Sequence, residues 1–205
     1  MILRKVKINN YWTRALFAST CLSLVATVSQ AHTGHGTSGL MEGVAHPFGL
    51  DHLLAMVAVG IWSVSNLPAN RAWWGPATFM VSLVISAIIG TQGVTLPYLE
   101  NMISLSVVMF GLMLVFAGYK KPTGFSLALI AISAALHGLA HGAESPETGF
   151  APYAIGFLIA TAFLHFGGVV ATLAIQRYLP SKEKIISTFI GVIFGSAGIY
   201  LFSQI

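Results

Sequence analysis

The sequence predicts an all-α membrane protein, and three observations support this fold class. Of its 205 residues, 56% are hydrophobic and 8% are charged, whereas soluble proteins carry about 25% charged residues. The apolar residues form runs close to the length of a membrane-spanning helix, about 20 residues. These runs lack an alternation of period two, and only helices or closed barrels satisfy backbone hydrogen bonds within lipid. We therefore expect a bundle of transmembrane helices.

The first 31 residues have the organisation of a secretory signal peptide. Basic residues precede an apolar stretch over 15–28, and small residues occupy both cleavage-determining positions of Ser29-Gln30-Ala31. We predict cleavage after Ala31, so that residues 1–31 are the signal peptide and residues 32–205 the transmembrane domain. An uncleaved anchor is the alternative, although the apolar stretch is short for a span of about 20 residues.

The positive charge belongs mainly to this N-terminal segment. The formal net charge is +4, but four of the ten basic residues precede the first apolar stretch, and the other six balance six acidic residues. The sequence therefore does not indicate a nucleic-acid partner. The single cysteine, Cys21, lies within the predicted signal peptide. A metal site in the mature chain must then use nitrogen, oxygen or thioether sulfur.

Six apolar runs follow, and each is near the length of a spanning helix. The runs cover Val44–Ser65, Ala72–Gly90, Met102–Tyr119, Gly124–His141, Pro152–Gln176 and Ile185–Phe202. All basic residues of the mature chain fall in the first, third and fifth connections: Arg71, Lys120, Lys121, Arg177, Lys182 and Lys184. The positive-inside rule makes these connections cytoplasmic and both mature termini periplasmic, as in a bacterial inner-membrane protein. A 3+3 inverted repeat is possible, with halves that begin at the first and fourth runs.

The first run begins with the polar residues His46, Asp51 and His52. Burying a carboxylate in lipid costs at least about 2.5–3.5 kcal/mol on insertion scales, so Asp51 requires a partner or a hydrated cavity. Pro47 and Gly49 permit a broken or late-starting helix that aims Asp51 and His52 at one point. Because the residue before a proline is disfavoured in helical geometry, we expect His46 on an extended segment at the entrance to the site.

The fourth run ends with His137 and His141, which share one helical face because they lie four residues apart. A helix presents two imidazoles to one metal ion at this spacing. Gly138 and Gly142 leave space for another helix beside them. Hydrogen bonds from these histidines to carbonyls are the structural alternative. At about 1.5 Å per residue, both polar clusters lie roughly 7–12 Å from the predicted periplasmic ends of their runs, so they can face one another.

Other residues are candidates for additional ligands. Met56 lies one turn beyond His52 and could supply a thioether, with core packing as the alternative. His165 falls about 20 Å along the fifth run, too deep for the same site, and a second stop on a permeation path and a satisfied core histidine are equal alternatives. His32 and His35 would begin the mature chain and could capture metal, or could form a tail without a role.

These motifs resemble those of the HupE/UreJ proteins, a family of nickel or cobalt permeases, and the resemblance spans the whole chain. The family pattern His-Gly-x-Ala-His-Gly-x-Glu is present from His137 to Glu144, with Leu136 where phenylalanine is usual. In the first motif, four residues rather than the usual five separate His46 from Asp51, which puts the role of His46 in doubt. The resemblance implies six spans and a metal site formed by His46, Asp51, His52, His137, His141 and Glu144.

Together these features predict a permease that takes nickel or cobalt from the periplasm and releases it into the cytoplasm. Sites rich in imidazole and without thiolate also suit zinc and copper(II), whereas magnesium and calcium prefer oxygen. The short cytoplasmic connections contain no phosphate-loop motif, so a gradient, the membrane potential or intracellular trapping must supply the energy. We expect no catalytic cofactor, and the sequence does not indicate an oligomeric state.

The competing hypothesis is an intramembrane zinc hydrolase. Three histidines would hold zinc, and Asp51 or Glu144 would activate a bound water. Metal flux into liposomes would indicate the permease, whereas stoichiometric zinc together with cleavage of lipid or peptide would indicate the hydrolase. A metal sensor is a third class, which would normally need a soluble output domain.

Overall fold

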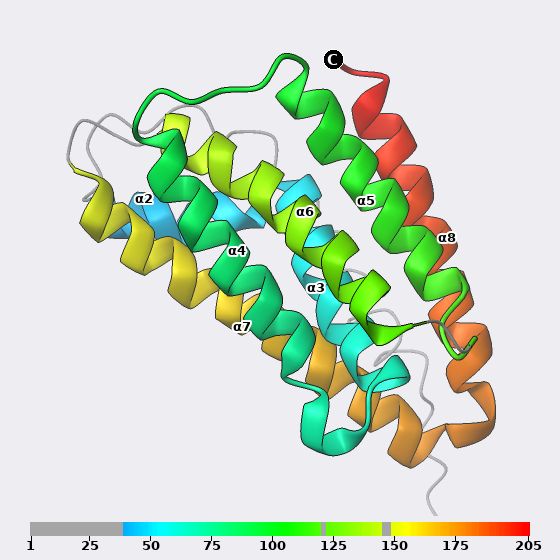
Figure 1. The fold of residues 1–205 in the computed structure, drawn as a ribbon. Helices are drawn as coiled ribbons and strands as arrows, with labels where there is room; N and C mark the ends of the chain where they lie inside the picture. Colours follow the sequence, from blue (N-terminus) through cyan, green and yellow to red (C-terminus); the bar gives the residue numbers. More distant parts are fainter. Residues whose placement is uncertain (1–38, 120–121, 145–148) are drawn as a thin grey trace, which may run out of the picture.

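The computed structural model describes residues 39–119, 122–144 and 149–205, which are largely helical (Figure 1). The α-helices of this part are α2 (Gly39–Ala45), α3 (Leu50–Asn66), α4 (Trp74–Gly90), α5 (Leu99–Val115), α6 (Thr123–Ala143), α7 (Phe150–Tyr178) and α8 (Glu183–Phe202). Short 3-10 helices occupy His46–Phe48 (η1), Ala69–Arg71 (η2) and Pro180–Lys182 (η3). The described residues contain no strand, which confirms the all-α class. The predicted signal peptide, His32 and His35 lie outside them.

The helices differ in whether they are long enough to cross a membrane. Four segments of the described chain are sufficiently long and apolar: Ala69–Gly90, Thr123–Ala143, Phe150–Tyr178 and Pro180–Phe202. A fifth candidate arises if Gly39–Phe48 and Leu50–Asn66 count as one bent span. Helix α5 is apolar but has 17 residues. The described chain therefore has four to five candidate spans, and six spans stay a prediction.

The first predicted run is broken where its sequence suggested. Helix α2 and η1 meet α3 at a bend of 72°. At the bend, Gly49 has φ −52° and ψ 140°, and its N–H donates to the carbonyl of His46. The expectation that His46 lies on an extended segment is wrong, because His46 opens η1. Ala45, which precedes it, keeps right-handed helical geometry, so the chain stays helical through Pro47 and extends only at Gly49.

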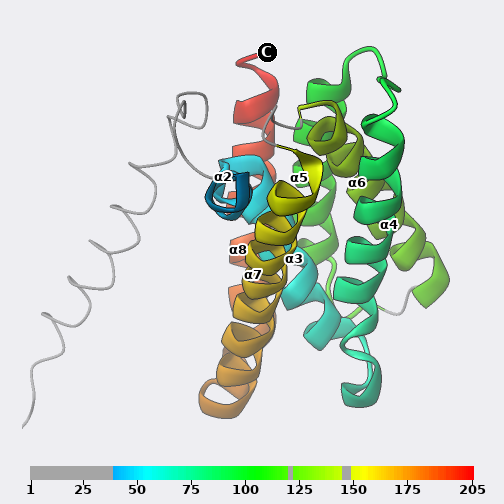
Figure 2. The same cartoon turned by 90° about the vertical axis from the view of Figure 1, so that its left-hand side faces the viewer.

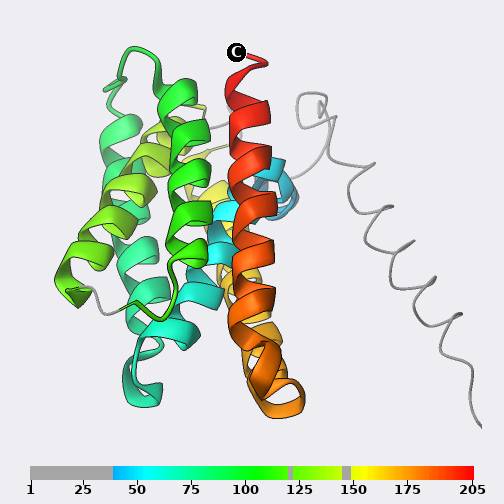
Figure 3. The same ribbon diagram turned by 90° about the vertical axis from the view of Figure 1, so that its right-hand side faces the viewer.

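Glycines allow the helices to pack in close pairs. Helix α4 runs along α6, α5 along α8, and α7 along both α2 and α3 (Figures 1 and 3). A Cβ on Gly138 would collide with the hydroxyl of Ser86, and one on Gly142 with the backbone of Ala87. The space that these two glycines were expected to leave is thus filled by α4.

Glycines likewise let α2 pack closely against the first half of α7, as Figure 2 shows. A Cβ on Gly43 would overlap the carbonyl of Tyr153, and one on Gly156 would overlap the carbonyl of Leu40. Between α5 and α8, a Cβ on Gly191 would lie 2.6 Å from the carbonyl oxygen of Gly111. Such close approach of backbones is typical of helix packing in membranes.

The outer surface of the bundle carries many large apolar side chains. On α7, Ile159, Phe163 and Phe166 are 60%, 66% and 63% exposed, and on α8 Ile185 and Phe189 are each 65% exposed. Soluble monomers rarely expose contiguous apolar surface of this kind. The surface therefore fits a multi-pass membrane protein whose helices face lipid.

The described basic connections lie at one end of the bundle. The turns η2 and η3 are together at the end opposite the C-terminus and the loop that joins α4 to α5 (Figures 1 and 3). These turns carry Arg71 and Lys182. Helices that alternate in direction, as the charge pattern predicts, place the two turns in this way.

Candidate metal site

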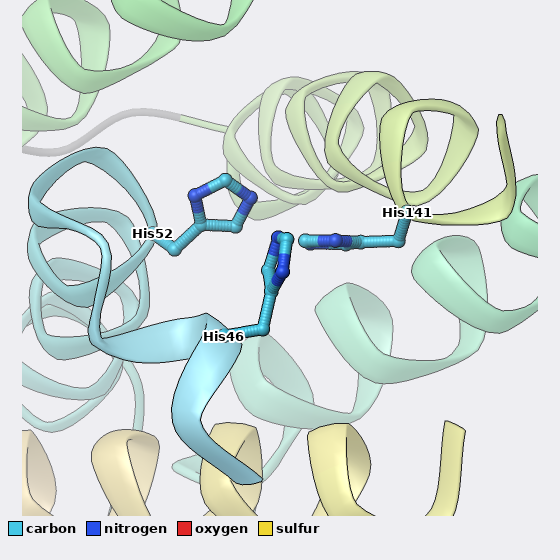
Figure 4. A group of neighbouring side chains, drawn as sticks. All are labelled: His46, His52 and His141. Carbon is cyan, nitrogen blue, oxygen red and sulfur yellow. The ribbon is translucent and has the colours of Figure 1, made fainter. Parts of the chain in front are cut away.

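Three histidine rings converge where η1, α3 and α6 meet. His46, His52 and His141 each offer a nitrogen, and these nitrogens lie within 4.8 Å of one another (Figure 4). The ring centroids of His46 and His52 are 4.6 Å and 4.5 Å from that of His141. His137 extends the group inward, because its ring lies 4.8 Å from His52. The two motifs of the sequence therefore face one another.

The Nδ1 atoms of the buried rings are held by the protein. His52 Nδ1 donates to Asp51 Oδ1 at 2.7 Å, and His137 Nδ1 donates to the carbonyl of Ser133 at 2.9 Å. Because a carboxylate and a carbonyl can only accept, Nδ1 carries the proton, and in the neutral ring Nε2 keeps its lone pair. The Tyr153 hydroxyl lies 3.5 Å from His141 Nδ1. His52 and His137 are thus held from their Nδ1 sides, and His141 has a polar neighbour on the same side of its ring.

The Nε2 atoms of these rings have no hydrogen-bond partner in the part of the chain that the structure describes. In His52, His137 and His141, Nε2 is buried without a hydrogen bond from the described part of the chain. The three residues are 7%, 0% and 1% exposed. A buried polar atom without a partner costs about 1–3 kcal/mol, so three in one cluster indicate a ligand. Several imidazole nitrogens without thiolate suit a divalent ion of nickel, cobalt, zinc or copper.

Asp51 lies behind His52 rather than within the group of three. Its Oδ1 accepts from the ring and also from the backbone N–H of His52, at 2.8 Å. A carboxylate in this position fixes the orientation of a ligating imidazole and raises its basicity. Asp51 can therefore act through His52, and direct ligation by Asp51 stays a prediction.

Comparison with known proteins identifies the family. The family described as HupE / UreJ protein matches residues 20–201. Protein HupE of Rhizobium leguminosarum bv. viciae is 39% identical over 155 residues, which cover 74% of this chain and 80% of that protein. The chain belongs to the HupE/UreJ family. HupE/UreJ proteins are generally associated with nickel and cobalt transport rather than catalysis. No solved structure matches the chain.

The other candidate ligands of this HupE/UreJ chain lie outside the group of three. Glu144 is exposed at the C-terminal end of α6, where its N–H donates to the carbonyl of Ala140. Met56 is fully buried in the hydrophobic core, which fits its core-packing alternative. His165 is buried on α7, and its ring contacts Phe79 at 5.0 Å.

Two aromatic residues of α7 contact the site, and neither was identified as a site residue from the sequence. Tyr153 is 2% exposed and places its hydroxyl beside His141. The ring of Phe157 lies 4.1 Å from that of His141. A buried tyrosine usually needs a partner for its hydroxyl, so Tyr153 within an apolar run carried a weak signal. Phe157 carried none, because phenylalanine is common in any apolar helix.

Proposed function

We propose that this HupE/UreJ protein is an inner-membrane permease that moves nickel or cobalt from the periplasm to the cytoplasm. One observation carries this proposal. The Nε2 atoms of His52, His137 and His141 are buried and have no hydrogen-bond partner in the described chain, which indicates a ligand. The association of the family with nickel and cobalt transport supports it. Zinc and copper(II) are the alternative cargoes because they accept the same donors.

In this proposal the ion exchanges its water for imidazole nitrogen in steps. His46 is half-buried and lies on η1, at the outer edge of the cluster, so it receives the ion first. His52 and His141 complete the coordination shell. His137 lies one turn before His141 on α6 and is therefore the next ligand toward the cytoplasmic end. Asp51 offsets part of the ion's charge, and the exposed Glu144 attracts cations to the entrance. The site must bind moderately, because tight binding would prevent release.

The topology follows from the charge pattern. We place the η2 and η3 end in the cytoplasm because Arg71 and Lys182 lie there. The remaining assignments are six spans, with α2–α3 and the shorter α5 each counted as one, cleavage after Ala31, and periplasmic ends for the mature chain. The histidine cluster then lies in the periplasmic half of the bundle.

Metal flux into proteoliposomes that contain the purified full chain tests the proposal. We expect uptake of nickel or cobalt that exceeds uptake of magnesium, and loss of this uptake in the His52→Ala variant. Met56→Leu is the matched control, since it changes a buried residue of the same helix and removes only a thioether. A wild-type protein that moves none of nickel, cobalt, zinc or copper would contradict the proposal.

The zinc hydrolase alternative is not favoured. The family is associated with transport, and Asp51, one of its two candidate bases, already accepts two hydrogen bonds from His52 at Oδ1. The same preparation addresses it, because a hydrolase would retain stoichiometric zinc and cleave lipid or peptide.

A further inference from the structure

His165 has the same bonding pattern as a metal-site histidine, although it lies outside the histidine cluster. Its Nδ1 donates to the carbonyl of Thr161 at 2.9 Å, just as His137 Nδ1 donates to Ser133. Its Nε2 is buried and has no hydrogen-bond partner within the described ranges. The side chain is 2% exposed. A histidine satisfied by core hydrogen bonds would not leave this atom unpaired at a cost of about 1–3 kcal/mol.

A second unpaired donor lies one turn away on the same face of α7. The Thr161 hydroxyl is buried and without a partner in the described chain, and the residue is 0% exposed. A buried hydroxyl in a helix usually bonds to the carbonyl four residues earlier, as Thr172 does with Gly168 at 2.9 Å. Thr161 and His165 therefore form a pair of polar groups for which core packing gives no reason.

Phe79 contacts both this pair and the histidine cluster. It lies on α4, which packs against both α6 and α7, and it is 0% exposed. Its ring centroid lies 5.9 Å from that of His137 and 5.0 Å from that of His165. A ring in contact with both histidines is placed to obstruct direct transfer of an ion from one to the other. An apolar constriction of this kind closes a path by excluding water.

His165 also lines a surface pocket at the η2 side of the bundle. The pocket has a volume of about 340 Å³ and is lined by Trp73, which precedes α4, by Pro76 of α4, and by Phe166 and Val169 of α7. Its lining is almost entirely apolar and includes Trp73 and Phe166, which are 64% and 63% exposed on the outer surface of the bundle. The pocket therefore opens toward lipid, and the proposed path of the ion does not use it.

We propose that His165 and Thr161 form a second, transient metal site, which receives the ion from His137 when the side chain of Phe79 moves aside. This inference rests on the proposed transport function. One imidazole, one hydroxyl and water bind a divalent ion more weakly than several imidazoles do, so the second site favours release toward the cytoplasm. Phe79 then keeps the two sites from being continuously connected.

The test compares His165→Asn with wild type in two measurements on the purified full chain. Asparagine can still donate to the Thr161 carbonyl but has no atom at the position of Nε2. We expect equilibrium binding of nickel or cobalt at the histidine cluster to be unchanged. Flux into proteoliposomes should fall at least about tenfold, the smallest loss of activity typical when a residue that supports a metal site is changed. Thr172→Val is the matched control, a buried polar change on the same helix, and it should leave flux unchanged.

Phe79→Leu provides an independent arm if His165→Asn does not fold. A smaller side chain should obstruct the ion less and raise the flux, without changing the affinity of the histidine cluster for nickel or cobalt. Wild-type flux from a folded His165→Asn variant, or unchanged flux from Phe79→Leu, would overturn the second site while leaving the permease intact. Absence of metal flux in the wild-type protein would overturn the permease and the second site together.

Discussion

At the scale of single residues, the histidines of the cluster are held by chemically different partners. Asp51 supplies a carboxylate to His52, Ser133 a backbone carbonyl to His137, and Tyr153 a hydroxyl close to His141. All three partners contact Nδ1 and leave the Nε2 edge of the ring available for a ligand. The site is therefore oriented before an ion arrives, which lowers the entropic cost of binding.

Removal of a ligand should abolish transport without unfolding the protein. We expect His52→Ala, His137→Ala and His141→Ala each to eliminate nickel and cobalt uptake at near-normal membrane abundance. Each substitution breaks a contact at Nδ1 but also removes a buried Nε2 that has no partner in the described chain, so the two effects on stability offset one another. Metal uptake by cells, with immunoblots of the membranes, measures both effects. Undiminished uptake by any of the three variants would remove that histidine from the site.

Asp51→Asn should weaken binding while leaving the ligand in place. The amide oxygen can still accept from His52 Nδ1, but the negative charge that raises the basicity of the ring is lost. We expect the affinity for nickel or cobalt to fall about 10- to 100-fold, as for other partners of ligating histidines. Isothermal titration of the purified variant checks this value. Tyr153→Phe is the comparison, and its effect should be smaller because the hydroxyl lies 3.5 Å from His141.

His46→Ala should reduce uptake mainly at low metal concentration. His46 is half-buried at the edge of the cluster, and its loss leaves three imidazoles that can still hold the ion. His52→Ala should instead abolish uptake at every concentration. Dose-dependent uptake by the two variants distinguishes these roles. Equal and complete loss would make His46 indispensable as a ligand.

The approach of the two histidine motifs could be predicted from the sequence because polar residues are costly inside apolar runs. That cost marks His46, Asp51, His52, His137 and His141 as candidate ligands, but it marks His165 equally, and only the depth along the helix separates His165 from the others. The contacts of Tyr153 and Phe157 could not be predicted in the same way. They depend on how α7 packs against α2 and α3, and a single sequence does not contain that information.

At the scale of elements, the break in the first helix combines a predictable and an unpredictable part. Pro47 and Gly49 predict the interruption, since both weaken a continuous helix. The angle of 72° does not follow from these two residues, and it accompanies the close contact of Gly43 with the backbone of Tyr153 on α7. The bend brings His46 back toward His141, which explains why the shorter spacing of the first motif does not remove His46 from the cluster.

A methyl group on α6 should test how strongly the helix pairs position the site. We expect Gly142→Ala to lower the stability by about 1–3 kcal/mol, since its Cβ would overlap the backbone of α4. Gly167→Ala on α7 is the matched control, because a Cβ there meets no atom within 4 Å. Thermal unfolding in detergent compares the two. Equal stability of both variants would contradict the close contact between α4 and α6.

At the scale of the whole molecule, the helix pairs exchange partners as an inverted repeat would. If the halves begin at α2–α3 and at α6, the second helix of each half packs on the first helix of the other. These contacts are α4 with α6, and α7 with α2 and α3. The third helices, α5 and α8, pack on each other. The repeat was only a possibility from the sequence, where no similarity between the halves was visible, and this reciprocal packing supports it.

The reciprocal packing of the helices suggests how the passage to the proposed second metal site could open. The outer histidines come from the first helix of each half, whereas His165 and Phe79 come from the second helices, α7 and α4. In transporters built from repeats, one group of helices rocks against another around the bound ion. A shift of α4 relative to α7 would move Phe79 and open the passage between the two sites.

The orientation of the bundle is open to direct measurement. Arg71 and Lys182 lie at the η2 and η3 end, and the positive-inside rule places this end in the cytoplasm. In a Cys21→Ser background, we expect an impermeant thiol reagent to label Gln92→Cys in intact spheroplasts but not Asn70→Cys or Ser181→Cys. All three positions are exposed, so labelling after lysis is the control for reactivity. The reverse pattern would invert the protein and place the histidine cluster on the cytoplasmic side, where it would serve export rather than uptake.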